Sequence, residues 1–169
     1  FALREKVDLT VVGPENPLVE GIVDKFRGSG LDIFGPSSKA AMLEGSKIYS
    51  KNFMKKYGIR TAEYAAFDNI DNALKYVETC SYPVVVKADG LAAGKGVTIC
   101  KNHGEAESAL NDSMIKDVFK GAGKKVIVEE FLQGVEASIL AVTDGNTIIP
   151  FISSKDHKQI YNGGIGPNT

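Results

Sequence analysis

Residues 84–97 read Val-Val-Val-Lys-Ala-Asp-Gly-Leu-Ala-Ala-Gly-Lys-Gly-Val, and the interpretation of the whole chain rests on this stretch. An apolar run carries Lys87 into a glycine-rich loop, and Lys95 follows eight residues later between Gly94 and Gly96. A β-like run resumes at Val97, so the pattern predicts a strand, a loop and a second strand. Glycines let backbone approach a ligand closely, and backbone N–H groups with two ammonium groups suit a polyphosphate. An ordinary flexible β-turn is the alternative interpretation.

The loop differs from a P-loop, which needs Gly-x4-Gly-Lys-Ser/Thr at the start of a helix. The spacing from Gly90 to Gly94 is one residue too short, and Gly96 stands where the magnesium-binding hydroxyl is required. A β-branched run then follows in place of a helix. We therefore interpret the stretch as a glycine-rich hairpin folded over phosphates.

Composition limits the function classes. The chain has 169 residues, which is typical of one domain or of a domain plus part of another. Lys and Arg number 20 and Asp and Glu 21, and this balance argues against nucleic-acid or membrane partners. Cys80 and Cys100 lack C-x-x-C spacing and are interpreted as buried free thiols. No apolar run approaches the ~20 residues of a membrane span and no signal peptide is recognisable, so we expect a cytosolic protein.

The first part of the chain predicts one β-α-β unit with parallel strands and a right-handed crossover. Residues 7–12 and 31–34 are the expected strands, and Asn16 is the expected N-cap of one helix between them. Residues 13–15 follow the first strand, at the sheet edge that ligands favour. A plain β-α turn explains them equally well.

Serines mark the next two helices. Ser37 or Ser38 is expected to cap a short helix through Leu43, and Ser46 to cap the helix after it. The second helix is predicted to bury an apolar stripe of Tyr49, Phe53, Met54 and Tyr57. Lys47 lies in its first turn, where the helix dipole disfavours a cation, so it is either solvated or placed for an anion.

Residues 61–132 predict a small α+β unit of about four strands and two helices, beginning with an edge strand, and either Asn69 or Asp71 is expected to cap its first helix. Glu129 and Glu130 alternate on its last strand, so one carboxylate can face a pocket while the other faces solvent. A hairpin is predicted around Asp144-Gly145. After Ile152 the regular pattern stops and a glycine-rich loop is expected.

Eight motifs follow one another along nearly the whole chain: residues 11–15 with Pro17-Leu18, Phe34-Gly35-Pro36, residues 43–47, residues 86–97, residues 128–132, Glu136-Ala137-Ser138, Asp156-His157-Lys158 and Gly166-Pro167-Asn168-Thr169. Together they resemble the phosphoribosylamine–glycine ligases (glycinamide ribonucleotide synthetases), an ATP-grasp family of purine biosynthesis. The lysine-glycine stretch followed by Asp-His-Lys and Gly-Pro-Asn-Thr is specific to this ligase rather than to ATP-grasp proteins in general.

The resemblance implies a mixed fold, α/β followed by α+β. Residues 1–50 are expected to be the end of a Rossmann-like (pre-ATP-grasp) domain, and residues 51–169 a truncated ATP-grasp domain. In the latter, the lid subdomain covers about residues 61–132 and the central subdomain starts at residues 133–169. The implied activity is ATP-dependent ligation of glycine to 5-phosphoribosylamine through a glycyl phosphate, with Mg²⁺ or Mn²⁺, in an enzyme that is free-standing or fused to other purine-pathway enzymes.

The resemblance also implies roles for individual residues, with no catalytic nucleophile among them. The implied ATP-binding residues are Lys47 and Lys87 at the phosphates, Gly90, Gly94, Lys95 and Gly96 in the lid loop, Glu129, Glu130, Phe131 and Leu132 at the adenine, and Glu136 at the ribose. The implied border of the phosphoribosylamine and glycine site is Gly13, Pro14, Glu15, Asp156, His157, Lys158, Gly166, Pro167, Asn168 and Thr169.

Several departures from the family pattern shape the expectations. The family's first strand is missing, and its magnesium-binding Glu and Asn are expected downstream of Thr169, so no metal ligand is assigned here. Val135 replaces a glutamate that is common in the family. We therefore expect a fragment that is inactive alone. The alternatives are another ATP-grasp carboxylate–amine ligase and a non-catalytic nucleotide-binding fragment.

Overall fold

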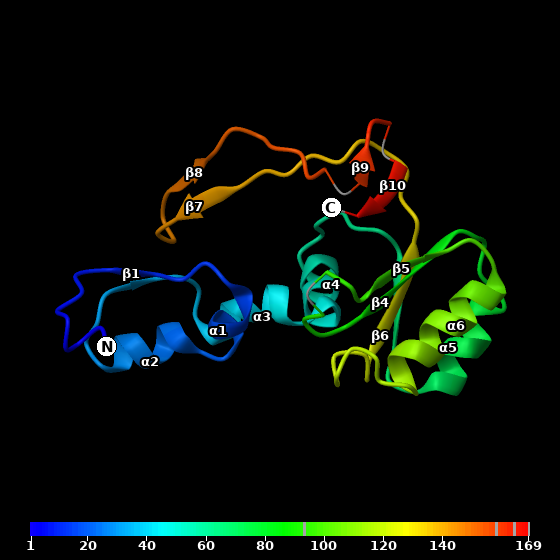
Figure 1. Ribbon diagram of the computed structural model, residues 1–169, viewed down its shortest axis with the longest axis horizontal. Helices are drawn as coiled ribbons and strands as arrows, with labels where there is room; N and C mark the ends of the chain where they lie inside the picture. Colours follow the sequence, from blue (N-terminus) through cyan, green and yellow to red (C-terminus); the bar gives the residue numbers. More distant parts are fainter. Residues whose placement is uncertain (93, 158, 164, 169) are drawn as a thin grey trace. The chain divides into compact units, whose positions relative to one another are not determined.

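A parallel pair of short strands opens the first of the two units into which the chain divides (Figure 1). The computed structural model describes residues 1–92, 94–157, 159–163 and 165–168, and its units are Phe1–Phe131 and Leu132–Thr169. Strand β1 (Thr10–Val11) pairs with β2 (Ile33–Phe34), with Thr10 opposite Ile33. The predicted parallel pair is confirmed, although both strands are shorter than expected.

The connection between these strands differs from the single predicted helix. It consists of α1 (Glu15–Val19) and α2 (Ile22–Gly28), and Gly21 between them has a φ of 82°. This left-handed conformation favours glycine and interrupts the helix without disturbing the apolar spacing on either side. The prediction of Asn16 as N-cap is wrong, because α1 begins at Glu15 and Pro14 precedes it without a side-chain cap.

The two serine-capped helices are confirmed as α3 (Ser38–Gly45) and α4 (Lys47–Lys56). The Ser37 Oγ accepts from the Ala40 N–H at 3.4 Å, and the Ser46 Oγ accepts from the Tyr49 N–H at 3.1 Å. These bonds satisfy N–H groups that the first turn of a helix leaves unpaired.

The predicted apolar stripe of α4 is wrong. Tyr49 and Tyr57 are 44% and 59% exposed, and Phe53 and Met54 are only half-buried. The buried residue of α4 is instead Lys51, at 8% exposure. A charged partner on a distant strand, described below, explains why this face turns inward.

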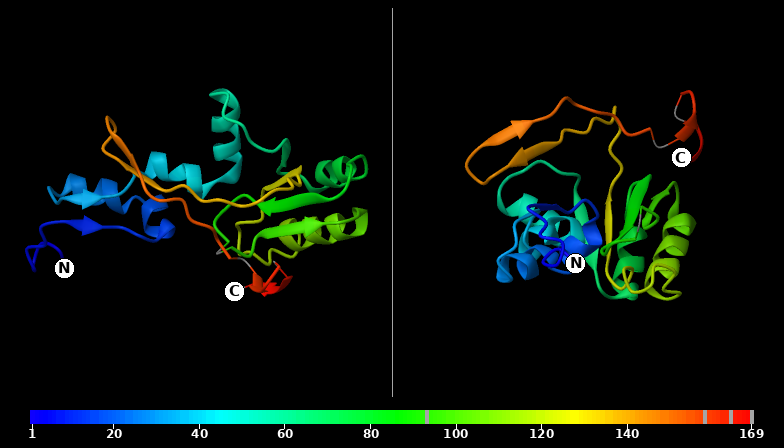
Figure 2. Two further views of the ribbon diagram at one scale, coloured as in Figure 1. Left: turned by 90° about the horizontal axis from the view of Figure 1, so that it is seen from above. Right: turned by 60° about the vertical axis from the view of Figure 1, so that its left-hand side comes forward.

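The α+β unit is confirmed as a four-stranded antiparallel sheet with two helices. Its strands are β3 (Tyr64–Phe67), β4 (Val84–Ala88), β5 (Val97–Cys100) and β6 (Val126–Glu130), in the order β3-β6-β4-β5, with β3 at an edge as predicted. Helices α5 (Ile70–Val77) and α6 (His103–Met114) lie side by side on one face of the sheet (Figures 1 and 2). Asn69 caps α5, as one of the two predicted alternatives.

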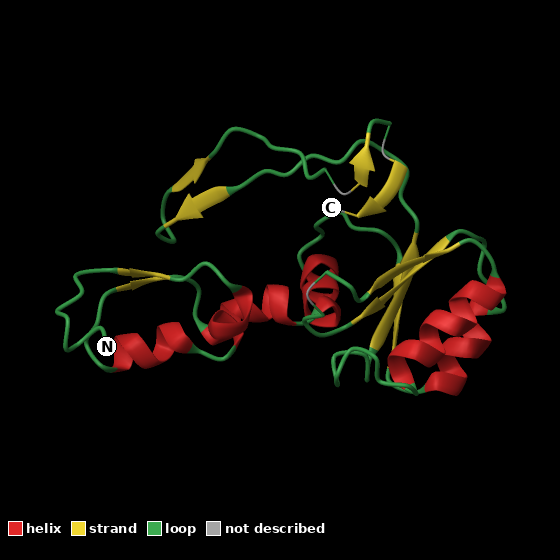
Figure 3. Ribbon diagram, viewed as in Figure 1, coloured by secondary structure: helices red, strands yellow, loops and turns green. Residues whose placement is uncertain are grey.

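The core of this unit lies between the sheet and these two helices. Val86 and Val128 point from the sheet into it, and Leu110 and Val77 meet them from α6 and α5. Because side chains alternate along a strand, the residues next to these valines, Lys87 on β4 and Glu129 on β6, face the other side of the sheet. Helix α4 contacts β6 on that other side, and Figure 3 shows the strands between α4 and the α5–α6 pair.

The second unit contains two short antiparallel pairs. Strands β7 (Ala141–Thr143) and β8 (Ile148–Pro150) form the predicted hairpin, and Asp144 Oδ1 accepts from the Asn146 and Thr147 N–H groups at 2.9 and 2.7 Å. Strand β9 (Gln159–Tyr161) pairs with β10 (Ile165–Asn168). The prediction of a loop over this final stretch is therefore wrong: Gly163, with a φ of 84°, makes a turn between paired strands.

Neither cysteine forms a disulfide. Cys100 is buried and Cys80 half-buried, and burial raises the pKa of both thiols, which favours the protonated form. Within the described ranges, no helix is both long enough and apolar enough to cross a membrane.

Candidate functional site

A buried carboxylate between two lysines forms the centre of the candidate site. Strand β6 places Glu129 on the sheet face opposite α5 and α6, where its side chain is 5% exposed. Its Oε1 pairs with the Lys87 ammonium from β4, and its Oε2 lies 2.6 Å from the Lys51 Nζ. Glu130 is exposed, so the predicted division between a pocket-facing and a solvent-facing carboxylate is confirmed.

Lys51 is a site residue that the sequence interpretation missed. Besides pairing with Glu129, its Nζ donates to the Thr61 Oγ1 at 2.6 Å and to the Ala62 carbonyl at 3.2 Å. One sequence signal was available: Lys47, Lys51 and Lys55 recur every four residues and so share a helix face. Which of the three is buried depends on where α4 meets β6, and local spacing does not contain that information.

The first turn of α4 is tied to the start of the glycine-rich loop through Asp89. The Asp89 Oδ1 accepts from the Ser46 hydroxyl and from the Ile48 N–H, each at 2.8 Å. The Lys47 N–H donates to the Asp89 carbonyl at 3.1 Å, and the Lys47 Nζ donates to the Gly90 carbonyl at 3.2 Å. Lys47 is thereby held beside the loop, which is a positioned rather than a freely solvated arrangement.

Burial and the helix dipole both act against the positive charge of Lys47. Burial lowers the pKa of the Lys47 ammonium below its ordinary value, while the carboxylates of Asp89 and Glu44 act in the opposite direction. Lysine at the beginning of a helix is also disfavoured by the helix dipole. An anion beside Lys47 would relieve both penalties, because it stabilises the charged form of the ammonium.

The loop after β4 has the predicted hairpin form and requires glycine at a crowded position. Strands β4 and β5 pair antiparallel, and the Ala88 N–H donates to the Gly96 carbonyl at 2.8 Å. A Cβ at Gly96 would lie 2.7 Å from the Ala92 Cβ, which is closer than real Cβ atoms approach. Gly94 has a φ of 74°, and Lys95 beside it is exposed.

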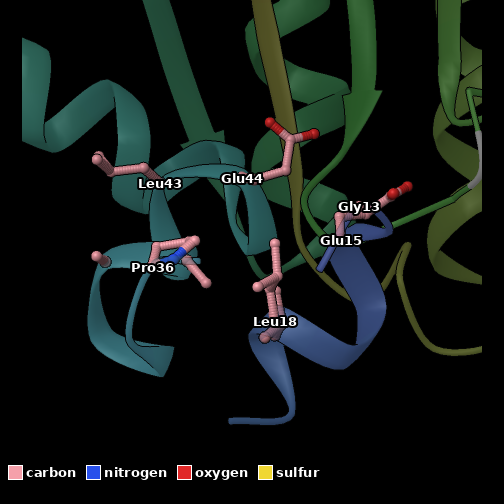
Figure 4. A pocket seen from close by; sticks show the side chains of 9 residues that line it. Gly13, Glu15, Leu18, Pro36, Leu43 and Glu44 are labelled. Atoms are coloured by element: carbon pink, nitrogen blue, oxygen red, sulfur yellow. The ribbon is translucent and has the colours of Figure 1, made fainter. Parts of the chain in front are cut away.

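Two neighbouring cavities border these residues. We call the first, of about 230 Å³, the lysine cavity; it is lined by Leu43, Glu44, Lys47, Ser50, Lys51, Met54, Lys87, Ile127 and Glu129. We call the second, of about 350 Å³, the Glu15 cavity; it is lined by Gly13, Glu15, Leu18, Val19, Pro36, Ala40, Ala41, Leu43 and Glu44. Figure 4 shows side chains of α1 and α3 around the Glu15 cavity.

Leu43 and Glu44 line both cavities. The lysines predicted to bind phosphate and the residues predicted to border the substrate site therefore lie in one region of the first unit. Lys47 and Lys87 border the lysine cavity, and Gly13 and Glu15 border the Glu15 cavity. Pro14, between them in sequence, lies at neither lining and is exposed. Glu44 was part of a recognised motif but had no predicted role.

The remaining predicted residues lie elsewhere. Glu130 and Phe131 line a third cavity of about 540 Å³ at the end of β6, together with Glu129, which also lines the lysine cavity, and residues such as Cys80 and Tyr82. Leu132 begins the second unit, where Glu136, Asp156 and His157 are exposed and residues 166–168 belong to β10. Lys158 and Thr169 lie outside the described residues, and the roles of all these residues stay predictions.

Metal binding has no candidate in the part of the chain that is described, where no group of three or more His, Cys, Asp or Glu side chains could hold an ion. The expectation that metal ligands follow Thr169 stays a prediction.

Two family models together match the whole chain. The N domain of phosphoribosylglycinamide synthetase matches residues 1–44, and the ATP-grasp (A) domain of the same synthetase matches residues 45–169. The chain belongs to the phosphoribosylglycinamide synthetase family. Its motif order and its ATP-grasp fold are thus those expected from the resemblance.

Curated relatives of this synthetase chain are similar over its full length. The phosphoribosylamine–glycine ligase of Clostridium acetobutylicum is 62% identical over 169 residues, which are 100% of this chain and 41% of the relative. The ligase of Fusobacterium nucleatum is 59% identical, again over 100% of this chain and 40% of the relative. The chain therefore spans about two fifths of the length of the curated relatives that it matches.

Solved structures agree with this assignment of the synthetase fold. The crystal structure of phosphoribosylamine–glycine ligase from Thermotoga maritima matches with a TM-score of 0.79 and 36% identity, over 94% of this chain and 39% of that one. Biotin carboxylase from Campylobacter jejuni matches with a TM-score of 0.75 at 19% identity, over 88% of this chain and 34% of that one. The second likeness supports the shared fold alone.

In this synthetase chain, Gly96→Ala is expected to lower stability by about 1–3 kcal/mol, because the new methyl group must displace Ala92 or Ala88. Weaker ATP binding should accompany the loss, since the loop itself is deformed. Thermal denaturation and ATP titration measure the two effects. Gly28→Ala is the matched control, because a Cβ there meets nothing within 4 Å. Equal melting temperatures for the two variants would contradict the expectation.

Asp89→Ala is expected to destabilise the synthetase fold by about 1–2 kcal/mol, because the variant leaves the Ile48 N–H and the Ser46 hydroxyl without their acceptor. Asp89→Asn keeps a carbonyl oxygen at the same place and should lose less than half as much. Urea unfolding of both variants provides the comparison. If the asparagine variant is as unstable as the alanine variant, charge rather than hydrogen bonding governs this contact.

Proposed function

We propose that the protein containing this chain uses ATP to ligate glycine to 5-phosphoribosylamine, giving glycinamide ribonucleotide, ADP and phosphate. The observation that carries the proposal is the lysine cavity, where Lys47 and Lys87 meet the glycine-rich hairpin beside the Glu15 cavity. Membership of the phosphoribosylglycinamide synthetase family and the names of the curated relatives support it. With it we propose a Rossmann-like part over about residues 1–50 and an ATP-grasp part after it.

Cations at the lysine cavity suit the nucleotide phosphates. Lys47 and Lys87 are half-buried ammonium groups, which neutralise phosphate charge more effectively than fully solvated ones. The N–H groups of the hairpin from Gly90 to Gly96 would face the β- and γ-phosphates. The backbone of Glu129 to Leu132 would bind the adenine edge, and Glu136 the ribose hydroxyls.

The proposed reaction has two steps, and the chain contributes charge and orientation to both. A glycine carboxylate oxygen attacks the γ-phosphorus and ADP leaves, giving glycyl phosphate. The amine of phosphoribosylamine then attacks the acyl carbon, and phosphate leaves. Because phosphoryl transfer depends mainly on positioning and on neutralised charge, no nucleophilic side chain is required.

Further parts of the proposal concern the metal, the substrates and the location. Mg²⁺ or Mn²⁺ would neutralise phosphate charge, with its ligands on residues that follow Thr169. Gly13, Pro14 and Glu15, with residues 156–158 and 166–169, would border the phosphoribosylamine and glycine site. The substrates are small polar molecules, so we propose a cytosolic enzyme without nucleic-acid or membrane partners, free-standing or fused to other purine-pathway enzymes.

The deciding experiment measures ADP release by the complete reading frame that contains this chain. Glycine and freshly prepared phosphoribosylamine are supplied together and singly. Release that requires both supports the ligase. Release with neither, or no release while ATP still binds, would favour another ATP-grasp ligase or a nucleotide-binding module. Residues 1–169 alone are expected to form no product.

A further inference from the structure

The Lys51 ammonium is buried and held by groups within the protein. An ammonium group has three N–H donors. The Lys51 Nζ donates to the Thr61 Oγ1 at 2.6 Å and to the Ala62 carbonyl at 3.2 Å, and it forms an ion pair with the Glu129 Oε2 at 2.6 Å. Its side chain is only 10% exposed. Two of its donors are thus used by Thr61 and Ala62 and its charge is paired with Glu129, so little of the ammonium is open to a ligand although Lys51 lines the lysine cavity.

Lys87 pairs with the other oxygen of the Glu129 carboxylate and is more exposed than Lys51. Its side chain is 28% exposed, and Glu129 takes up one side of its ammonium through Oε1. If Glu129 had Lys87 as its only counter-ion, the pair would be neutral, and a phosphate would compete with the carboxylate for the ammonium. With Lys51 on Oε2, the cluster of two ammonium groups and one carboxylate carries a net positive charge.

We propose that Lys51 is a positioning residue for ATP: by neutralising Glu129 it leaves the Lys87 ammonium available to the nucleotide phosphates. Lys51 contacts no phosphate itself and acts only through Glu129. This inference rests on the proposed function, since it requires that the lysine cavity binds ATP.

The experiment compares Lys51→Met with Lys55→Met in the complete reading frame. Lys55 lies one turn further along α4 and is exposed, so it controls for the loss of a helix lysine. ATP and adenosine are titrated by calorimetry. Lys51→Met is expected to weaken ATP binding about tenfold, which corresponds to one charge interaction at a partly shielded site. Adenosine should bind both variants within about twofold of the unmodified protein.

The double variant Lys51→Met/Glu129→Gln separates charge from architecture. It removes one positive and one negative group, so Lys87 again meets the phosphates as an uncompensated cation. ATP affinity should return to within about threefold of the unmodified protein. The double variant leaves no charge at the buried positions 51 and 129, so it still decides the matter if Lys51→Met alone does not fold.

Three results would overturn the inference. One is equal ATP affinity of Lys51→Met and Lys55→Met. Another is a loss in Lys51→Met that is as large for adenosine as for ATP, which indicates a general structural role. The third is a folded double variant that remains tenfold weaker. Failure of the unmodified protein to bind ATP is a separate result, because it contradicts the proposed function itself.

Discussion

Replacing Lys87 by alanine is expected to lower kcat/KM for ATP by about 100- to 1,000-fold in the complete enzyme. The reason is that, in the proposed reaction, the half-buried Lys87 ammonium would meet developing phosphate charge, and a charge interaction at such a site is stronger than that of a solvated group. Removal also leaves the Glu129 carboxylate facing the phosphates with only Lys51 opposite it. ADP release as a function of ATP concentration measures the loss.

Lys75→Ala serves as the control for this variant, because Lys75 is an exposed lysine of α5 on the far side of the sheet. It should retain activity within about twofold. A Lys87→Ala enzyme within threefold of the unmodified one would exclude a direct phosphate role for Lys87.

Glu129→Ala is expected to destabilise the first unit by about 3–5 kcal/mol, the largest effect on stability among the variants considered. The substitution leaves the Lys51 ammonium buried without its carboxylate, at 10% exposure, and removes the partner of Lys87. The free-energy cost of burying an unpaired charge is far larger than the net stability that an ion pair contributes. Urea unfolding followed by circular dichroism gives the difference in free energy.

The neighbouring carboxylate supplies the control. Glu130→Ala removes an exposed side chain whose recorded hydrogen bond, from the Glu63 N–H, is long at 3.4 Å, so stability should change by no more than about 0.5 kcal/mol. Glu129→Ala and Glu130→Ala thus differ only in the face of β6 from which the carboxylate is lost. Similar unfolding midpoints would mean that the buried ion cluster contributes little.

Local chemistry explains the parts of the fold that could be predicted. Ser37, Ser46 and Asn69 each cap a helix because their short side chains reach an unpaired N–H of the first turn, which is a relation between residues three apart. The hairpin around residues 84–97 follows from two β-like runs joined by glycines. The alternation of Glu129 and Glu130 follows from the strand itself.

Long-range contacts explain the parts that could not be predicted. Hydrophobicity alone predicts an apolar stripe on α4 of Tyr49, Phe53, Met54 and Tyr57. The helix instead turns Lys51 inward, because Glu129 lies there on β6. The division of the first helix at Gly21 reflects a backbone conformation that glycine permits but does not require. Asp89 was visible in the sequence, yet its link to Ser46 spans 43 residues.

The wall that Leu43 and Glu44 form between the two cavities suggests a route to selective inhibitors. A compound with one arm for each cavity, joined across Glu44, would make its second contact intramolecularly. Linking arms in this way can raise avidity by about 10²–10⁴ when the linker length matches the span. Other ATP-dependent enzymes that offer a site for the first arm alone would bind such a compound no more tightly because of its second arm.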